Sequence, residues 1–246
     1  MSRRNLVTAH QANYLPYLGF FQKILVSDLF VLVDDTQFVK RGAFGWIHRN
    51  KILSPNGPIW LTVPVKTHDA YFQTIAETEC ADNASWRRKH LKSVQVAYRK
   101  SPFFDEFYPG IEKLYSSDYR FLFDYSKDFI FWVLEVLNIR IPVQISSDLK
   151  LEGKGSEYVL DLAQKTNATH YLSGMHGKDY LELDRFKSEN MGLVFQDFTC
   201  VEYKQQFGNE FVPYLSIIDA LFNVGVEGTL ALMRKGENYE VPEKEF

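Results

Sequence analysis

Cysteine is scarce in this sequence, and the motifs that most often identify an enzyme are missing. Only Cys80 and Cys200 occur in 246 residues, and they lie far apart without a C-x-x-C pattern. We therefore expect two free thiols, with neither a disulfide framework nor a structural zinc site. The sequence also has no P-loop, no G-x-S-x-G elbow and no H-E-x-x-H pair, so none of those chemistries is indicated.

Long apolar runs and a strong net charge are also absent. No stretch of about 18 apolar residues marks a membrane span, and no apolar signal segment precedes the first predicted strand, so we expect a cytoplasmic protein. A formal net charge of −3 gives no general attraction to nucleic acid. Without internal repeats, low-complexity segments or long linkers, the chain is expected to form a single domain over residues 1–246.

Apolar residues make up 46% of the chain, and short apolar runs alternate with segments of helical periodicity. Strands are expected at 6–7, 29–33, 59–63, 143–145, 170–172 and 193–198, and helices at 17–25, 86–98, 121–137, 156–165 and 215–222. The first half of the sheet is expected to extend to about residue 78. The pattern predicts an α/β fold with a mainly parallel, doubly wound sheet of the nucleotide-binding kind, and with a helical insertion or subdomain at about 82–140.

Polar side chains follow the first two predicted strands at the points where these strands end. His10, Gln11 and Asn13 come after the first strand, and Asp34 and Asp35 come after the second. Ligands of open α/β sheets bind beyond the carboxyl ends of the strands, so the sequence predicts a ligand site here. The alternative is a capped turn whose histidine and asparagine satisfy backbone groups.

The paired aspartates permit more than one role. Either could bind Mg²⁺ that bridges phosphates, or accept a hydrogen bond from a sugar hydroxyl, while helix capping is the alternative. Because side chains alternate along a strand, we expect only one of Asp34 and Asp35 to enter the site. Magnesium is therefore left open, and no other cofactor is indicated.

A basic and aromatic segment adds further candidates for substrate binding. Arg49, Asn50 and Lys51 follow Trp46 in a stretch without regular periodicity, which is typical of a binding loop. Arginine suits a phosphate or carboxylate, and Trp46 could stack on a base or a sugar.

A second candidate loop follows the predicted strand at 170–172. It offers Ser173, Gly174 and His176 as a cradle for a phosphate or carboxylate, although a glycine-bearing turn without a ligand explains it nearly as well. If the loops after these three strands are neighbours, His10, one aspartate and Ser173 converge. The predicted substrate-binding set is completed by Tyr14, Tyr17 and Gln37.

Eight runs along the chain carry a resemblance to a known family. They are His10-Gln11-x-x-Tyr14-Leu15-Pro16, Gly19-Phe20-Phe21-x-Lys23-Ile24, Val31-Leu32-x-Asp34-Asp35-x-Gln37-Phe38, Arg49-Asn50-x-Ile52, Trp60-Leu61-Thr62-Val63-Pro64-Val65, Trp86-Arg87-Arg88-Lys89-His90, Tyr171-Leu172-Ser173-Gly174 and Phe211-x-Pro213-x-Leu215-Ser216-x-Ile218-Asp219. In this order they closely resemble the WbqC-like protein family, except that Ala12 stands where a proline is usual and Tyr17 where a tryptophan is usual. The resemblance implies a bacterial protein associated with surface-polysaccharide (O-antigen) biosynthesis, in a family where some members are labelled glycine or other group transferases.

Together these features predict a transferase of the glycine, acyl or nucleotidyl type that acts on a nucleotide-linked or otherwise activated sugar or small molecule. His10 would be the general base or a donor to developing charge. Asp35 would bind a hydroxyl or magnesium, and Gln11 and Asn13 would orient the substrate. The alternative is a non-catalytic ligand-binding or scaffold protein of the same pathway. Either way the expected partner is an anionic or nucleotide-linked small molecule rather than a nucleic acid, and a homo-oligomer is left open.

Overall fold

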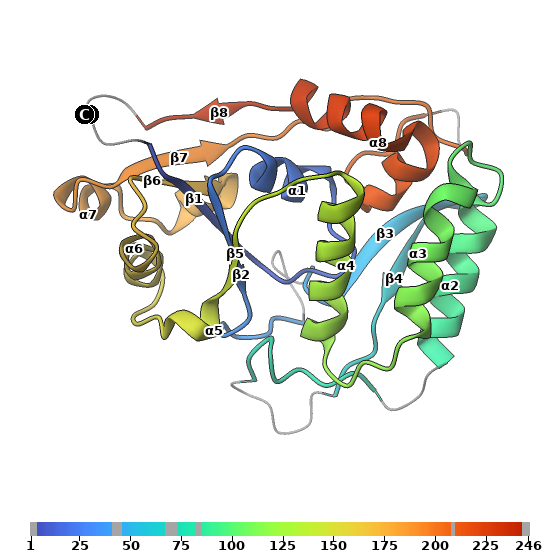
Figure 1. The fold of residues 1–246 in the computed structure, drawn as a ribbon, viewed down its shortest axis with the longest axis horizontal. Helices are drawn as coiled ribbons and strands as arrows, with labels where there is room; N and C mark the ends of the chain where they lie inside the picture. Colours follow the sequence, from blue (N-terminus) through green and yellow to red (C-terminus); the bar gives the residue numbers. More distant parts are fainter. Residues whose placement is uncertain (1–3, 41–45, 67–72, 82–84, 208–209, 243–246) are drawn as a thin grey trace.

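The computed structural model places a sheet at one end of the molecule and a group of helices at the other (Figure 1). It describes residues 4–40, 46–66, 73–81, 85–207 and 210–242. The strands are β1 (Leu6–Gln11), β2 (Leu29–Val33), β3 (Arg49–Ser54), β4 (Gly57–Thr62), β5 (Val143–Ile145), β6 (His170–Gly174), β7 (Gly192–Gln196) and β8 (Tyr239–Glu240). The helices are α1 (Leu18–Leu25), α2 (Ser85–Tyr98), α3 (Phe104–Ser116), α4 (Leu122–Val136), α5 (Ser146–Leu149), α6 (Ser156–Lys165), the 3-10 helix η1 (Met175–Asp179), α7 (Leu183–Ser188) and α8 (Ile217–Lys235).

Six strands form the main sheet, in the order β5-β2-β1-β6-β7-β8. All neighbours pair in parallel except β7 and β8, which are antiparallel. The predicted α/β class with a mainly parallel sheet is therefore confirmed.

The prediction that the strand near 59–63 belongs to this sheet is wrong. It forms β4, which pairs only with β3 in a separate antiparallel hairpin among the described strands. The turn between them is tight: Ser54 Oγ donates to the carbonyl of Gly57 at 2.7 Å, and Gly57 has a φ of 101° that favours glycine. Local pairing across this turn takes β4 out of the main sheet.

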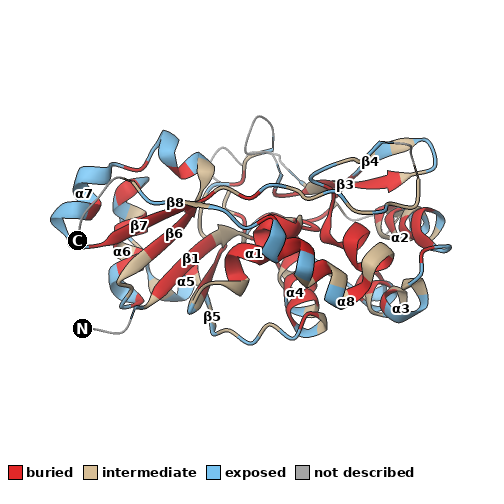
Figure 2. Ribbon diagram, turned by 90° about the horizontal axis from the view of Figure 1, so that it is seen from above, coloured by how far each residue is buried: buried red, intermediate tan, exposed pale blue. Residues whose placement is uncertain are grey.

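Helices cover both faces of the main sheet, and the alternation along β1 sorts its side chains between them. Val7 and Ala9 face a core built with α6 and α7, whereas Leu6 and His10 face α1. Figure 2 shows the buried strands between these helices, with α2, α3, α4 and α8 extending away from the sheet. His10 is therefore directed toward α1 by the register of its strand.

A buried hydrogen-bonded cluster joins the loop after β1 to the helical end. The hydroxyl of Tyr14 contacts His90 Nδ1 at 2.8 Å and also contacts the hydroxyl of Tyr115. Burial lowers the pKa of His90 to about 4, so its ring is neutral at pH 7. Helices α2, α3 and α4 occupy the predicted helical segment, of which 82–84 lies outside the described residues.

A second buried cluster surrounds Asp219 on α8. Its carboxylate accepts hydrogen bonds from Tyr98 at 2.9 Å, from Tyr203 at 2.6 Å and from Gln205 at 3.2 Å. Burial raises the pKa of this carboxyl, and the donors oppose the rise. The cluster ties α8 to α2 and to the segment before α8, which gives Asp219 a structural role.

Helix α8 is longer than the sequence predicts, because it continues through a kink. Gly225 has a φ of 68°, and the ring of Phe103 lies where a side chain at this position would be. The helix resumes beyond the kink and ends at Lys235. None of the helices in the described part of the chain combines the length and apolar composition that a membrane crossing requires.

Candidate functional site

Strands β1 and β6 separate at their carboxyl ends. Their pairing stops at Thr8 and Leu172, although β1 remains paired with β2 as far as Gln11 and β6 with β7 as far as Gly174. The chain runs outward from β1 toward β2 and β5, and then returns to lay β6 and β7 on the other side. Ligands of open α/β sheets bind where the strand order reverses in this way. We use the name β1–β6 gap for the position beyond Thr8 and Leu172, where these two strands no longer pair.

His10 lies beside this gap in a neutral state. Its Nδ1 is 3.1 Å from the carbonyl oxygen of Gln11, so the proton belongs on Nδ1 and leaves Nε2 as an acceptor. The ring packs edge-on against Phe20 at 4.7 Å between centroids. Burial and the nearby charge of Lys23 lower the pKa of His10 to about 3, which makes it a weak base in the free protein.

Lys23 on α1 was not among the residues that the sequence singled out for function, yet its amine lies at the same place. Nζ donates to the carbonyl of Ala9 at 2.9 Å, and the residue is 3% exposed. Burial lowers its pKa to about 7. Among the described carboxylates, none lies within ion-pair distance of this amine.

The loop after β1 brings Asn13 close to the chain that enters β3. The amide of the next residue, Tyr14, donates to the carbonyl of Ile47 at 2.9 Å. Asn13 Oδ1 and His48 Nδ1 are both buried without a hydrogen-bond partner. Burial and the charges of Arg49 and Lys40 lower the pKa of His48 to about 4. His48 belongs to the same basic cluster of the sequence as Arg49, Asn50 and Lys51, but it was not selected as a site residue.

The paired aspartates after β2 contact α5 and α6 and do not point apart. Asp34 accepts from the backbone and hydroxyl of Ser147 at 3.0 and 2.8 Å, and from Ser146 Oγ at 3.0 Å. Asp35 Oδ1 accepts from Tyr158 at 2.7 Å and lies 2.6 Å from the same Ser146 hydroxyl, whose single proton the two carboxylates share. Strand alternation does not apply to this pair, because β2 ends at Val33, and the expectation that only one of the two aspartates enters the site stays a prediction. Asp34 therefore has the capping role given as the alternative, whereas Asp35 Oδ2 accepts no hydrogen bond from a described residue.

No group of three or more His, Cys, Asp or Glu side chains in the described ranges is arranged to hold a metal ion. Asp35 Oδ2 is the oxygen that could meet a cation carried in by a phosphate. Gln11 lies near this side of the site, where its Nε2 donates to Thr36 Oγ1 at 3.0 Å.

The loop after β6 places its three predicted residues differently. Ser173 is buried, and its hydroxyl donates to the carbonyl of Gly174 at 3.1 Å. A side chain at Gly177 would meet this hydroxyl at 2.0 Å, so the glycine permits the close packing of η1. His176 is exposed and pairs with Asp179 at 3.4 Å. The order β2-β1-β6 provides the strand adjacency that the predicted convergence of His10, Asp35 and Ser173 requires.

The residues predicted in a loop near Trp46 belong instead to the β3–β4 hairpin. Arg49 and Lys51 lie on its outer side, where the guanidinium of Arg49 is 4.7 Å from the Trp60 ring centroid and Lys51 Nζ is 5.6 Å from it. Trp46 and Trp60 are exposed, with centroids 5.1 Å apart. Asn50 points inward and donates to the carbonyl of Leu15 at 2.6 Å, a structural contact.

The last predicted binding residues lie in three separate settings. Tyr14 is fully buried in the cluster with His90, away from solvent. Tyr17 packs near Phe198 and Tyr214, which cover the start of α1. Gln37 is exposed and its backbone bridges to Thr74.

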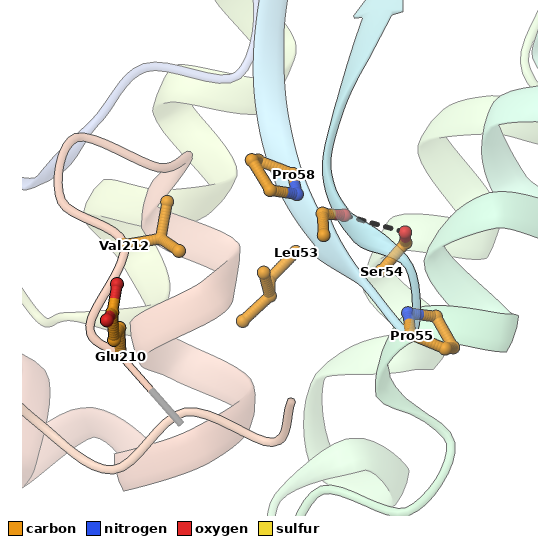
Figure 3. A pocket seen from close by; sticks show the side chains of 7 residues that line it. Leu53, Ser54, Pro55, Pro58, Glu210 and Val212 are labelled. Atoms are coloured by element: carbon orange, nitrogen blue, oxygen red, sulfur yellow. Dashed lines mark hydrogen bonds between the residues drawn. The ribbon is translucent and has the colours of Figure 1, made fainter. Parts of the chain in front are cut away.

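A hollow of about 350 Å³ lies at the turn of the β3–β4 hairpin (Figure 3). Its lining is Leu53, Ser54, Pro55, Gly57, Pro58, Glu210 and Val212. Figure 3 shows Leu53 and Val212 on opposite sides of it. Glu210 is the one ionisable side chain in this lining, which offers less chemistry than the strand ends.

Comparison with known proteins gives one family and one curated relative. A sequence profile described as the WbqC-like protein family matches residues 11–230. The chain is also similar to the uncharacterized protein Rv1507c of Mycobacterium tuberculosis (strain ATCC 25618 / H37Rv), with 31% identity over 219 residues that cover 88% of this chain and 93% of that protein. No solved structure matches the chain.

Proposed function

Since the chain belongs to the WbqC-like protein family, we propose that it is a group transferase whose site lies at the β1–β6 gap. Its substrate would be a nucleotide-linked or otherwise activated sugar or small molecule, used in the assembly of a bacterial surface polysaccharide. The separation of β1 from β6 is the observation that carries this proposal. It occurs where the strand order reverses, beside His10, Gln11 and Ser173.

The strand order supports a nucleotide-linked donor. Counting only the parallel strands, the chain builds β1, β2 and β5 to one side and then β6 and β7 to the other. Doubly wound dinucleotide-binding sheets have the same order and bind at the reversal. Fold alone does not define chemistry, so the residues at the gap must carry the reaction.

The chemistry available at the gap suits transfer to a hydroxyl or amine. His10 Nε2 is placed to accept a hydrogen bond from the attacking group, because its other nitrogen is held by the Gln11 carbonyl. A ring with a pKa of about 3 is a weak base in the free protein, and the negative charge of a bound donor would raise that pKa. His10 would then take the proton of the attacking group, while the nucleotide or other activating group of the donor leaves with the bonding electrons. Gln11 and Asn13 would orient the substrate, and Asp35 Oδ2 would meet a sugar hydroxyl or a phosphate-bound Mg²⁺.

A donor panel tests this proposal. Nucleotide sugars, nucleoside triphosphates and acyl or aminoacyl donors are screened by thermal shift with and without Mg²⁺, and binders are incubated with sugar and amine acceptors for product detection by mass spectrometry. We expect one donor class to bind and to be consumed, and His10→Ala to lose at least about a hundredfold in rate.

The matched control is His170→Ala. His170 lies at the amino end of β6, and thus at the end of the sheet opposite to the proposed site. Turnover by His10→Ala at the wild-type rate would overturn the catalytic assignment. Binding without product for any donor would support the non-catalytic ligand-binding alternative instead.

A further inference from the structure

We propose that Lys23 is the anion receptor of this site, where its amine binds a phosphate or carboxylate group of the substrate and gains a proton as the anion arrives. The inference rests on the proposed function and specifies the charged group that the substrate carries. It begins from the position of one side chain on α1.

Lys23 lies on the buried side of a short apolar helix. Every residue from Leu18 to Ile24 is buried, and the lysine extends from this helix to β1. Its Nζ donates to the carbonyl of Ala9 at 2.9 Å. Ala9 directly follows Thr8, the last residue of β1 that pairs with β6. The amine therefore lies at the start of the β1–β6 gap.

Two of the three donors of a charged Lys23 have no acceptor in the part of the chain that the structure describes. An ammonium group has three N–H donors, and Ala9 accepts the one hydrogen bond that Nζ makes within the described residues. Unpaired donors on a buried cation cost free energy that an apolar side chain of similar length would avoid. Packing alone therefore gives no reason for a lysine here, whereas an anionic ligand does.

Within the described ranges, the charged groups around α1 do not provide a counter-ion for Lys23. On β1 the nearby titratable group is His10, which is neutral. On α8, which packs against α1, the buried Asp219 is engaged by tyrosines, and Glu227, Arg234 and Lys235 are exposed.

The described residues of β7, β8 and the start of β1 do not place a free carboxylate beside Lys23 either. On β7, Gln196 donates to the carbonyl of Gly19 at 2.8 Å and carries no charge. On β8, Tyr239 contacts Gln22 and Glu240 pairs with Lys178 of η1. At the start of β1, Asp28 accepts from the backbone of Leu6 at 2.8 Å. None of the described residues supplies a negative charge that pairs with Lys23, so we assign this charge to a ligand.

Protonation couples to binding at this position. Burial lowers the pKa of Lys23 to about 7, so the amine is mostly neutral at pH 8. A bound anion favours the charged form and raises the pKa. Anion binding at pH 8 therefore takes up close to one proton, which a surface lysine would not do because it is already charged.

Isothermal titration calorimetry on the full chain measures this uptake. Phosphate, pyrophosphate, acetate and UDP are titrated at pH 8 in two buffers of different ionisation enthalpy, and the same titrations are made with Lys23→Met and with Lys165→Met. The second variant is the matched control, because Lys165 pairs with Asp161 at 2.9 Å on α6. Comparing acetate with the phosphates identifies which anionic group is preferred.

We expect wild type and Lys165→Met to take up close to one proton per anion, and Lys23→Met to lose affinity by about tenfold or more without proton uptake. Anion binding without proton uptake, equal affinity in Lys23→Met, or no binding by any of the four anions would overturn the proposal. Acetate does not titrate near pH 8, so its proton uptake by wild type reports on the protein even if Lys23→Met folds poorly. If the donor panel gives a product but none of the four anions binds in the calorimeter, the Lys23 proposal alone is refuted. If an anion binds with proton uptake but no donor gives a product, only the transferase proposal is refuted.

Discussion

Two buried groups of polar side chains in this protein differ in how completely they are paired. The carboxylate of Asp219 accepts hydrogen bonds from Tyr98, Tyr203 and Gln205. At the carboxyl ends of the strands, Lys23 makes one hydrogen bond and has no counter-ion in the described chain, and the neutral His10 lies beside it. Burial is similar in the two places, so it does not distinguish structure from function here.

The hydrogen-bond partners of a buried polar group, and not its burial, distinguish the two places. Buried polar groups in folded proteins are almost always hydrogen-bonded, and exceptions call for an explanation. The exceptions among the described amide and imidazole atoms are Asn13 Oδ1, His48 Nδ1 and Gln73 Oε1, and the remaining ones are hydroxyls on Tyr125, Ser126, Ser216 and Thr229. Backbone hydrogen bonds join Gln73 to Phe38 and Ile47 to Tyr14. Asn13, His48 and Gln73 therefore lie in the loops after β1 and β2 or in segments bonded to them.

The largest change in the free energy of unfolding is expected in the fully paired cluster around Asp219. Asp219→Ala should lower the free energy of unfolding by about 4 kcal/mol, because two tyrosine hydroxyls and an amide lose a charged acceptor while remaining buried. Urea denaturation measures the change, with Glu227→Ala on the exposed side of the same helix as control. A loss below about 1 kcal/mol would mean that the Asp219 cluster is not a structural anchor.

At Lys23 we expect a substitution to raise the free energy of unfolding, not to lower it. Its folded-state pKa of about 7 lies below the unfolded value near 10.4, so below pH 7 both states are charged and the folded state bears the full cost of burial. This cost corresponds to roughly 5 kcal/mol at most, and it disappears between pH 7 and pH 10 as the unfolded amine also becomes neutral.

Lys23→Met should therefore be more stable than wild type by about 3 kcal/mol at pH 6, with the gain shrinking toward pH 10. Denaturation of both proteins at pH 6, 8 and 10 checks this. A variant that is less stable at pH 6, or a difference that does not change with pH, would contradict the account.

Tyr14→Phe is expected to have an intermediate effect. The missing hydroxyl leaves His90 Nδ1 and the Tyr115 hydroxyl without that partner, which should cost about 2 kcal/mol. Tyr108→Phe is the control, since its half-buried ring stacks on Phe104 at 4.5 Å and its hydroxyl makes no hydrogen bond to any described residue. If the two variants unfold at the same urea concentration, the Tyr14 cluster contributes nothing measurable.

The smallest stability effect is expected at His48. Its Nδ1 is already unpaired and its ring packs edge-on against Phe38 at 5.5 Å, so His48→Phe should change the free energy of unfolding by less than about 1 kcal/mol in either direction. Affinity for the ligand found in the donor panel should fall in the same variant. A large loss of stability with unchanged affinity would place His48 with the structural cluster.

The strands that pair in parallel were predictable because their apolar runs are short and bounded by turn residues. The prediction of β5 at 143–145 and of α6 at 156–165 matches the structure at both ends. The partner of β4 was not predictable, since a six-residue run of this kind fits a sheet and a hairpin equally well and pairing is not encoded locally.

The candidate site was only partly accessible from sequence, for a physical reason. His10 and Asp35 could be selected because polar residues at strand ends have a known geometric meaning. Lys23 could not, because a lysine in a helix usually extends to solvent. The available signal was its position three residues after Phe20 and directly before Ile24, on the apolar side of α1. Asp219 carried a similar signal, as one acidic residue within an apolar run.

The pKa of Lys23 tests the central claim most directly. A pH titration followed by ¹³C NMR of the lysine side chains, with the Lys23 signal assigned by its absence in Lys23→Met, gives this value with and without phosphate. The account predicts a midpoint near 7 in the free protein and a clear rise when phosphate is bound. A midpoint near 10 in the free protein, or one that phosphate leaves unchanged, would contradict an anion site at the β1–β6 gap.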